Sequence, residues 1–396
     1  MNSTAKTGTH QPLSGITIVD FSQLIAGPAA TSLLVGLGAD VIKVEPPSGD
    51  PMRNLSAAER DHGESSGSFQ AYNAGKRSVV IDLKTASGVR SALALCARAD
   101  VIVESFRPGV MTRLGLDFEA LRSERPRLVT VSITAFGSRS PESGRGGVDI
   151  VLQAETGFMA ATGTPDTGPL KAGAPIIDSA TGYVAALAAV TGLLNVERTG
   201  VGAAVEVPMF DVGVHLQSQA FSEFALTGVP PVRCGNRAPY AAPAGVFRAA
   251  DGELVVSAHL PRHWKLLCEA LGLSRLVVDE RFLAVEDRVR NREELEALLS
   301  AEFERRTVDE WVDDLTARGL TVGTVRSYAD VMGSAQAQAT GLFAPARTDG
   351  SSATLLARVP LRSSAWVAPQ LPTTPRLGEH SVEIIDPAEL IGVHHD

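Results

Sequence analysis

The run GITIVDFSQLIAGPAATSLLVGLGADVIKVE, residues 15–45, decides the fold class. Residues 15–21 and 40–45 are short and rich in β-branched side chains, so each predicts a strand. The small-residue segment 28–37 predicts a helix between them, with proline in its first turn and Gly38 at its end. A strand, a helix and a strand in this order predict a right-handed βαβ unit with parallel strands.

The same alternation continues to residue 226. We expect further strands over residues 77–82, 100–106, 128–134 and 204–207, and helices over 85–99, 117–124, 179–196 and 211–226. Segment 179–196 is apolar nearly all round, so we expect a buried helix there. Residues 46–76 are polar and irregular, as functional loops often are. This pattern predicts an α/β fold with a mainly parallel sheet.

A second, smaller α+β domain is expected further along the chain. Residues 228–243 are rich in Gly, Pro and Ala, which marks a boundary. Residues 246–257 predict a hairpin with Asp251-Gly252 at its turn. Helices are expected over 263–271 and within the charged segment 288–319, where Thr307 and Glu310 match a capping box.

The composition excludes several classes of protein. The 396 residues carry 36 Lys and Arg against 45 Asp and Glu, a formal net charge of −9. An acidic chain argues against a nucleic-acid partner, although a local basic pocket for an anion remains compatible with it. The polar residues 1–12 lack a signal peptide, and the apolar run 184–194 is too short to span a bilayer. We therefore expect a cytoplasmic protein without a membrane partner.

Common cofactor motifs are absent from the sequence. No G-x-G-x-x-G opens a helix after a strand and no P-loop occurs, so we expect no nicotinamide or flavin cofactor. Cys96, Cys234 and Cys268 lie far apart without a CxxC pair, and the eight His are scattered. We therefore expect neither a disulfide framework nor a metal site.

Asp178 is the acid that attracts attention, because it stands directly before the apolar segment 179–196. One interpretation is structural: Asp is a favoured helix N-cap. The other is chemical, because a helix N-terminus favours an ionised carboxylate, which can attack an activated acyl group. The two interpretations do not exclude each other.

Several basic residues precede Asp178 near the expected strand ends, where open α/β sheets bind ligands. Each alone could be a solvated surface charge, but together they suggest a ligand with phosphates. They are Lys43, Lys76, Arg77, Lys84, Arg107, Arg113 and Arg145.

Several ordered blocks of this sequence resemble a known family. They are PLSGITIVDF (12–21), AGP (26–28), LGADVIKVE (37–45), NAGKRSVVIDLK (73–84), ADVIVESFRPG (99–109), AGAPIID (172–178) and LGEH (377–380). The chain resembles the class III CoA-transferases, the family of formyl-CoA transferase and carnitine CoA-transferase, which also includes α-methylacyl-CoA racemase.

This resemblance implies an interlocked homodimer whose large Rossmann-like domain is built from the N-terminal half and the C-terminal tail, with a small domain inserted. The boundaries expected are 12–200 for the N-terminal part of the large domain, 201–228 for a linker helix region, 229–325 for the small domain, and 326–396 for the linker and C-terminal return.

The resemblance also implies an activity and a site. The enzyme would move CoA from an acyl-CoA donor to a carboxylic acid acceptor through an aspartyl anhydride and an aspartyl–CoA thioester, with Asp178 as the catalytic residue. Ser105 replaces a commoner Asn. The family's CoA-binding positions fall on Ile25, Ala26, Ile81, Lys84, Ser105, Phe106, Arg113 and Arg145.

Two alternatives follow from the same resemblance. The racemase branch has a His in a Gly-His-Asp stretch and a Glu before Pro, where this chain has Val148 and Leu260, which cannot exchange protons. His259 is one residue away and could substitute. A CoA-binding protein without catalysis is the other alternative, and the presence of Asp178 argues against it. Arg237 could bind a second carboxylate of a dicarboxylic acid or form a salt bridge.

Overall fold

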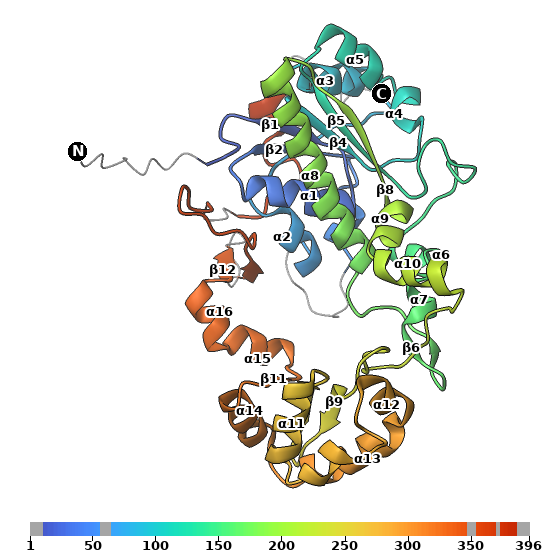
Figure 1. The fold of residues 1–396 in the computed structure, drawn as a ribbon. Coiled ribbons are helices and arrows are strands. Elements are labelled where there is room, and N and C mark those ends of the chain that lie inside the picture. Colours follow the sequence, from blue (N-terminus) through green and yellow to red (C-terminus); the bar gives the residue numbers. More distant parts are fainter. Residues whose placement is uncertain (1–10, 56–64, 347–353, 370–372, 386–396) are drawn as a thin grey trace, which may run out of the picture. The chain divides into compact units, whose positions relative to one another are not determined.

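The computed structural model describes residues 11–55, 65–346, 354–369 and 373–385. The chain forms two compact units (Figure 1). The first unit comprises residues 1–158, 171–226 and 338–396, and the second comprises 159–170 and 227–337. Residues 201–226, expected within a linker region, supply a strand and two helices to the first unit.

A six-stranded parallel sheet forms the centre of the first unit, in the order β3-β2-β1-β4-β5-β8. Its strands are β1 (Thr17–Asp20), β2 (Asp40–Glu45), β3 (Arg77–Val80), β4 (Val101–Glu104), β5 (Val129–Thr134) and β8 (Ala204–Pro208). The chain adds β2 and β3 on one side of β1, and then β4, β5 and β8 on the other. Such a reversal opens a crevice at the carboxyl ends of the strands, where ligands bind in α/β proteins.

Helices cover both faces of this sheet. The main helices of the first unit are α1 (Ala26–Val35), α2 (Gly67–Asn73), α3 (Ala86–Cys96), α4 (Val110–Arg113), α5 (Phe118–Glu124), α6 (Asp149–Glu155), α8 (Ile176–Thr199), α9 (Met209–His215) and α10 (Ser218–Thr227). Ile18 packs in the core with α1 and α8, whereas its neighbour Val19 packs in the core with α3. Successive side chains of a strand point to opposite faces, so β1 contributes to two hydrophobic cores. The strands and the α/β class predicted from the sequence are confirmed.

The long helix α8 packs closely against α1. A Cβ atom at Gly182 would lie 2.8 Å from the Cβ of Ala29, so only glycine permits this approach. By length and composition α8 could cross a membrane, but in this fold its inner face belongs to the core of the first unit. The expectation that the helix is buried all round is wrong for a single chain, because Tyr183, Leu187 and Leu194 are exposed on its other face.

The irregular loop expected over residues 46–76 holds more structure than its composition indicates. It contains a 3-10 turn, η1 (Pro51–Arg53), and helix α2. The side chain of Ser66 accepts a hydrogen bond from Phe69 N and so caps α2. Seven residues are too few for apolar periodicity to reveal such a helix.

The C-terminal segment belongs to the first unit. His380 N donates to Ser78 O at 2.9 Å, and Val80 N donates to the Ser381 hydroxyl at 3.0 Å. These bonds cover the outer edge of β3 and precede the short helix α17 (Ser381–Ile384). The hairpin of β12 (Phe343–Ala346) and β13 (Thr354–Ala357) also lies in this unit.

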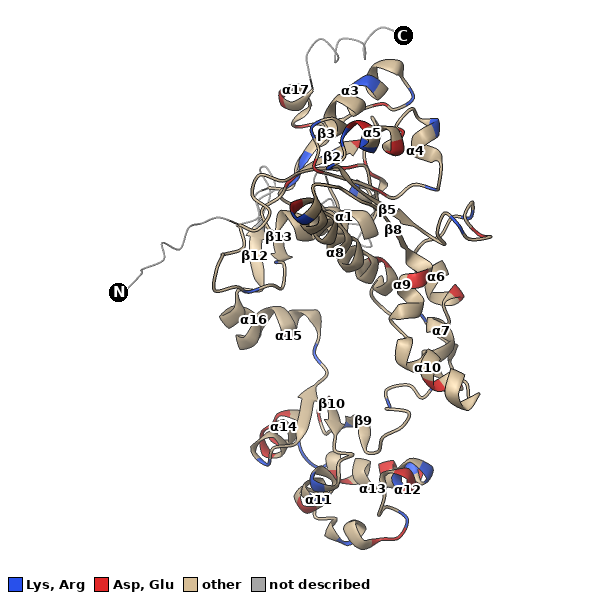
Figure 2. Ribbon diagram, turned by 45° about the horizontal axis from the view of Figure 1, so that its top comes forward, with Lys and Arg blue, Asp and Glu red and all other residues tan. Residues whose placement is uncertain are grey.

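The second unit contains a three-stranded antiparallel sheet in the order β11-β10-β9. Its strands are β9 (Ala244–Arg248), β10 (Glu253–Ser257) and β11 (Thr321–Thr324), and its larger helices are α11 (Pro261–Ala270), α12 (Val285–Arg290), α13 (Arg292–Phe303) and α14 (Val308–Ala317). The predicted hairpin and the Thr307–Glu310 capping box are confirmed. Figure 2 shows the charged residues along these helices. Arg237 pairs with Glu296 at 2.6 Å, which agrees with the salt-bridge interpretation.

Candidate active site

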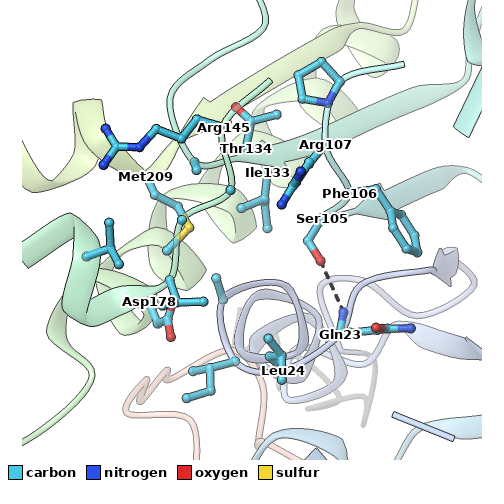
Figure 3. A pocket seen from close by; sticks show the side chains of 18 residues that line it. Gln23, Leu24, Ser105, Phe106, Arg107, Ile133, Thr134, Arg145, Asp178 and Met209 are labelled. Carbon is cyan, nitrogen blue, oxygen red and sulfur yellow. Dashed lines mark hydrogen bonds between the residues drawn. The ribbon is translucent and has the colours of Figure 1, made fainter. Parts of the chain in front are cut away.

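A cavity of about 490 Å³ lies at the carboxyl ends of β1, β4 and β5 (Figure 3). Residues 23–26 follow β1, residues 105–108 follow β4, and residues 133–135 end β5. The cavity therefore occupies the crevice that the strand order creates. Segment 145–148 and Asp178 complete its wall.

Asp178 lies in the first turn of α8, two residues after the helix begins at Ile176. The prediction that Asp178 is the N-cap is therefore wrong: the N-cap is Pro175, which offers no side-chain hydrogen bond. Asp149 satisfies the helix end instead. Its Oδ1 accepts hydrogen bonds from the backbone N–H groups of Ile177 at 2.8 Å and Asp178 at 3.2 Å. The carboxyl group of Asp178 is left to face the cavity.

The Asp178 carboxyl group is unusually basic. Burial, and then the negative charge of Asp149, raise its pKa from 3.8 to about 7. A helix N-terminus alone would lower this pKa. The loss of hydration outweighs that effect, because removing a carboxylate from water penalises its charged form. Asp178 is thus partly protonated at neutral pH.

Asp149 is itself held in place by Gln153, one turn later on α6. Gln153 Nε2 donates to Asp149 Oδ2 at 2.6 Å, and Gln153 Oε1 accepts from Ala172 N at 2.8 Å. Gln153 is fully buried. Helix α6 therefore fixes both the start of α8 and the strand-like segment before it. The sequence offered one signal for this pairing, an Asp and a Gln four residues apart at the start of a helix.

Another wall of the cavity is the turn between β1 and α1. Ile25 caps α1 without a side-chain hydrogen bond, and Leu24 has a φ of 64°, in the left-handed region. Gln23 N donates to the Ser105 hydroxyl at 3.2 Å, which ties this turn to the segment after β4 (Figure 3). The N-terminus of α1 offers backbone N–H groups that attract an anion.

Comparison with known proteins identifies the family. A family model described as CoA-transferase family III matches residues 13–381. The chain belongs to CoA-transferase family III. This family III enzyme is 35% identical to the probable fatty acyl-CoA transferase Rv3272 of Mycobacterium tuberculosis, over 94% of this chain and 96% of the relative. It is 32% identical to the succinate–glutarate CoA-transferase of Agrobacterium fabrum, over 96% of each chain.

A solved structure is similar to the whole family III enzyme. The crystal structure of a CAIB/BAIF family protein from Brucella suis matches with a TM-score of 0.86 and 32% identity. The match covers 95% of this chain and 98% of that one. The fold is therefore shared over nearly the full length, not only around the cavity.

Most of the residues that the resemblance assigned to CoA gather around two hollows in the family III enzyme. Ile25, Ala26, Ser105, Phe106 and Arg145 line the cavity with Asp178. Ile81 and Lys84 line a smaller hollow of about 170 Å³. Gln23 and Phe106 line both, so the two hollows adjoin. Arg113, at the end of α4, is exposed and is not part of either lining.

The basic residues that the sequence grouped together separate into different roles. Lys43 and Lys76 are fully buried in ion pairs and cannot reach a ligand. Arg77 pairs with Asp40 and Glu383. Arg145 pairs with Glu142 and Glu155, and its guanidinium points away from the cavity in Figure 3. Within the described parts of the chain, no ion pair engages Lys84, Arg107 or Arg113.

Arg107 is the cavity residue that the list of CoA-binding positions missed. Its guanidinium points into the cavity in Figure 3. A Cβ atom at Gly146 would lie 2.7 Å from Arg107 Nη2, so the glycine makes room for the guanidinium. The Gly146-Gly147 pair is therefore the sequence feature that could have indicated a side chain packed against the backbone there. Val148, at the position of the racemase His, also lines the cavity and offers no proton.

Proposed function

We propose that this enzyme transfers CoA from an acyl-CoA donor to a carboxylic acid acceptor, with Asp178 as the nucleophile. The observation that carries the proposal is the position of Asp178. It is a partly buried carboxyl group, with a pKa raised to about 7, on a cavity at the carboxyl ends of a parallel sheet. A carboxylate that has lost its hydration is a better nucleophile toward a thioester than one in water.

The first half of the reaction forms a covalent enzyme–CoA intermediate. An Asp178 oxygen attacks the thioester carbonyl carbon, the carbon–sulfur bond breaks, and CoA leaves as a thiolate. The product on the enzyme is a mixed anhydride of Asp178 and the donor acid. The thiolate then attacks the aspartyl carbonyl carbon, so that the donor acid leaves as a carboxylate and an aspartyl–CoA thioester remains.

The second half runs the same steps in reverse order. The acceptor carboxylate attacks the aspartyl thioester, CoA thiolate leaves, and a second anhydride forms. The thiolate attacks the acceptor's carbonyl carbon, which gives the new acyl-CoA and returns Asp178 to its carboxylate form. The two halves conserve the energy of the thioester provided that water does not hydrolyse either anhydride.

Groups around the cavity suit the charges that these steps create. The backbone N–H groups at residues 25 and 26, at the N-terminus of α1, are candidates to stabilise the oxyanion of each tetrahedral intermediate. The Arg107 guanidinium can attract an anionic part of the substrate into the cavity. Lys84 and Arg113 are proposed to contact the phosphates of CoA.

Intact-protein mass spectrometry tests the proposal. After incubation with an acyl-CoA, the protein should gain the mass of CoA less one water, and the peptide containing Asp178 should carry the adduct. Asp178→Ala should form no adduct and lose acyl transfer while still binding CoA. Asp313→Asn, which neutralises an exposed carboxylate on α14 outside the cavity, should behave as the unaltered enzyme. An adduct on another residue, or transfer by Asp178→Ala, would remove Asp178 from the mechanism.

The racemase alternative has its own test. A racemase exchanges the proton α to the thioester, so a 2-methylacyl-CoA would take up deuterium from deuterated water. Because Val148 occupies the cavity wall, we expect no exchange. Rapid exchange at that carbon would favour the racemase.

The donor and acceptor acids are best identified by a screen. Relatives carry names that include oxalate, succinate, mesaconate, glutarate and fatty acyl groups. We propose that this enzyme uses acids of one of these two classes, dicarboxylic or long-chain. One labelled acyl-CoA donor offered with a panel of both classes, and mass detection of new thioesters, would distinguish them.

We also propose that the enzyme is an interlocked homodimer. Apolar side chains exposed on α8 and α10 support this: Leu187 is 65% exposed and Phe224 is 45% exposed. A largely apolar hollow of about 490 Å³ follows α8, β8 and α9 in the same unit. Light scattering should give twice the chain mass, and Leu187→Asp should lower it.

A further inference from the structure

The turn from Ser22 to Pro28 forms one wall of the cavity and has an unfavourable conformation. Leu24 is in the left-handed region, which is unfavourable for a residue with a side chain. Ile25 caps α1 without using its side chain. A turn of this kind keeps one shape only when its surroundings hold it.

Beneath this turn lies a cluster of six charged side chains, none more than 6% exposed: Asp20, Lys43, Glu45, Asp50, Arg53 and Lys76. We call it the buried charge cluster. Lys43 pairs with Asp50 at 2.8 Å, Arg53 with Glu45 at 2.7 Å, and Lys76 with Asp20 at 3.1 Å. Three acids and three bases cancel, so the cluster carries no net charge.

Two of the three pairs hold the turn directly, through its backbone. Lys43 Nζ donates to Ser22 O at 2.9 Å, and Asp50 Oδ1 accepts from Leu24 N at 3.3 Å. The second of them, the Lys76–Asp20 pair, binds backbone atoms at both ends of the turn. Lys76 Nζ donates to Pro28 O at 3.1 Å, and Asp20 Oδ1 accepts from Ser22 N at 2.9 Å. The Arg53–Glu45 pair makes none of these contacts.

We propose that the Lys43–Asp50 and Lys76–Asp20 pairs are positioning residues, which hold the turn in the shape that receives the thioester opposite Asp178. This inference rests on the proposed function, because it assumes that acyl-CoA binds at the turn. Stability alone does not account for such pairs, since a protein core is often as stable or more stable when apolar residues of similar volume replace a buried ion pair. Their use is to fix backbone atoms that a hydrophobic core cannot fix.

Charge-neutral double variants test the proposal. Lys43→Met with Asp50→Asn removes one base and one acid, and the Asn oxygen can still accept from Leu24 N. Lys76→Met with Asp20→Asn does the same for the other pair. We expect each to fold, but with amide hydrogen exchange over residues 22–30 at least tenfold faster. The dissociation constant of CoA and the KM of the donor should rise at least tenfold, by more than kcat falls.

A core variant controls for lost stability. Leu95→Ala, on α3, should destabilise the first unit, because Leu95 is 2% exposed. Leu95 belongs to one hydrophobic core and Ala26, which ends the turn, belongs to the other. Leu95→Ala should leave CoA affinity within twofold. If both double variants fail to fold, Thr31→Val is a milder variant for the same measurements of exchange and CoA affinity. It removes only the 2.6 Å hydrogen bond from Thr31 Oγ1 to Asp20 Oδ2 and two longer bonds to backbone oxygens.

These experiments distinguish failure of the positioning role from failure of the proposed function. Folded doubles with unchanged exchange and unchanged CoA affinity would show that the pairs do not hold the turn. Faster exchange without weaker binding would also overturn the proposal, because the turn's shape would then not matter to the ligand. Failure of the proposed function has another signature: the unaltered protein would bind CoA without transferring it, and the CoA affinity of the doubles would still decide the positioning role.

Discussion

Replacing Asp149 by Asn should move the pH dependence of the enzyme to lower pH. The Asn side chain keeps an oxygen that can accept from Ile177 N and Asp178 N, so the start of α8 retains its cap. What the variant removes is the negative charge that raises the pKa of Asp178, together with the Oδ2 acceptor of the bond from Gln153 Nε2. The prediction therefore isolates electrostatics from helix capping.

The magnitude follows from the two causes of the shift. The pKa of Asp178 rises from 3.8 to about 7, with burial the larger cause and Asp149 the smaller. Asp149 is the smaller cause and therefore contributes less than half of the shift, and a repulsion of about 1.4 kcal/mol between the two carboxylates corresponds to about one pKa unit. In the variant the pKa should fall to about 6, so the ionised fraction at pH 6 rises about fivefold.

The assay is the pH dependence of kcat/KM for the acyl-CoA donor, which reports the free enzyme. The unaltered enzyme should gain activity with a midpoint near pH 7, and Asp149→Asn with a midpoint about one unit lower. Gln153→Leu is the control, because it releases Ala172 N but keeps the charge of Asp149. Its midpoint should not move. An unchanged midpoint in Asp149→Asn, or the same shift in both variants, would refute the electrostatic argument.

Three further predictions concern other parts of the site. Gly182→Ala should lower the free energy of unfolding by about 1–3 kcal/mol and remove most of the activity, because the added Cβ would push α8 away from α1. Calorimetry measures the change in stability, and Gly67→Ala is the control because the space around Gly67 is open. Arg107→Met should weaken CoA or acyl-CoA binding about tenfold at low salt and less at high salt, measured by calorimetry, whereas the exposed Arg127→Met should not. The contribution of Asp178 to the free energy of unfolding should fall by about 2–4 kcal/mol as pH rises from 4 to 8, because the folded state keeps the proton of Asp178 to a higher pH than the unfolded state does. In urea titrations the pH dependence of Asp178→Asn should lack this fall, and Asp178→Asn should be the more stable protein at pH 8.

The sheet could be predicted because the sequence of each strand alone indicates a buried strand. Val101 to Val103 and Val129 to Val131 are buried on both faces of the sheet and read as short apolar runs. Helix α2 could not be predicted, because its seven residues owe their conformation to the Ser66 cap and to burial of Phe69 rather than to periodicity.

The site was predicted only in part, because charge alone does not tell a ligand-binding cation from a structural one. Lys43 and Lys76 resemble Arg107 in the sequence, yet each is buried beside an acid. Asp20 becomes the partner of Lys76 only when the fold brings together two segments that are 56 residues apart, and Asp50 reaches Lys43 only because the chain turns back after β2. Asp149 was missed as the partner of Asp178 for the same reason, since 28 residues separate Asp149 from the N–H of Ile177 that it binds.

The raised pKa of Asp178 also bears on the stability of the proposed covalent intermediate. Ionised Asp178 is disfavoured by burial and by Asp149, and both penalties vanish when the carboxylate becomes a neutral anhydride or thioester. The same interactions that make the carboxylate basic therefore favour its covalent forms. In Asp149→Asn the relief is smaller by about one pKa unit, so the equilibrium between ionised enzyme with acyl-CoA and the aspartyl–CoA thioester should shift about tenfold toward free enzyme above pH 8. Quantifying the CoA adduct by mass spectrometry measures this directly. An adduct equally abundant in both proteins would mean that the charge of Asp149 disfavours ionised Asp178 and the aspartyl–CoA thioester equally.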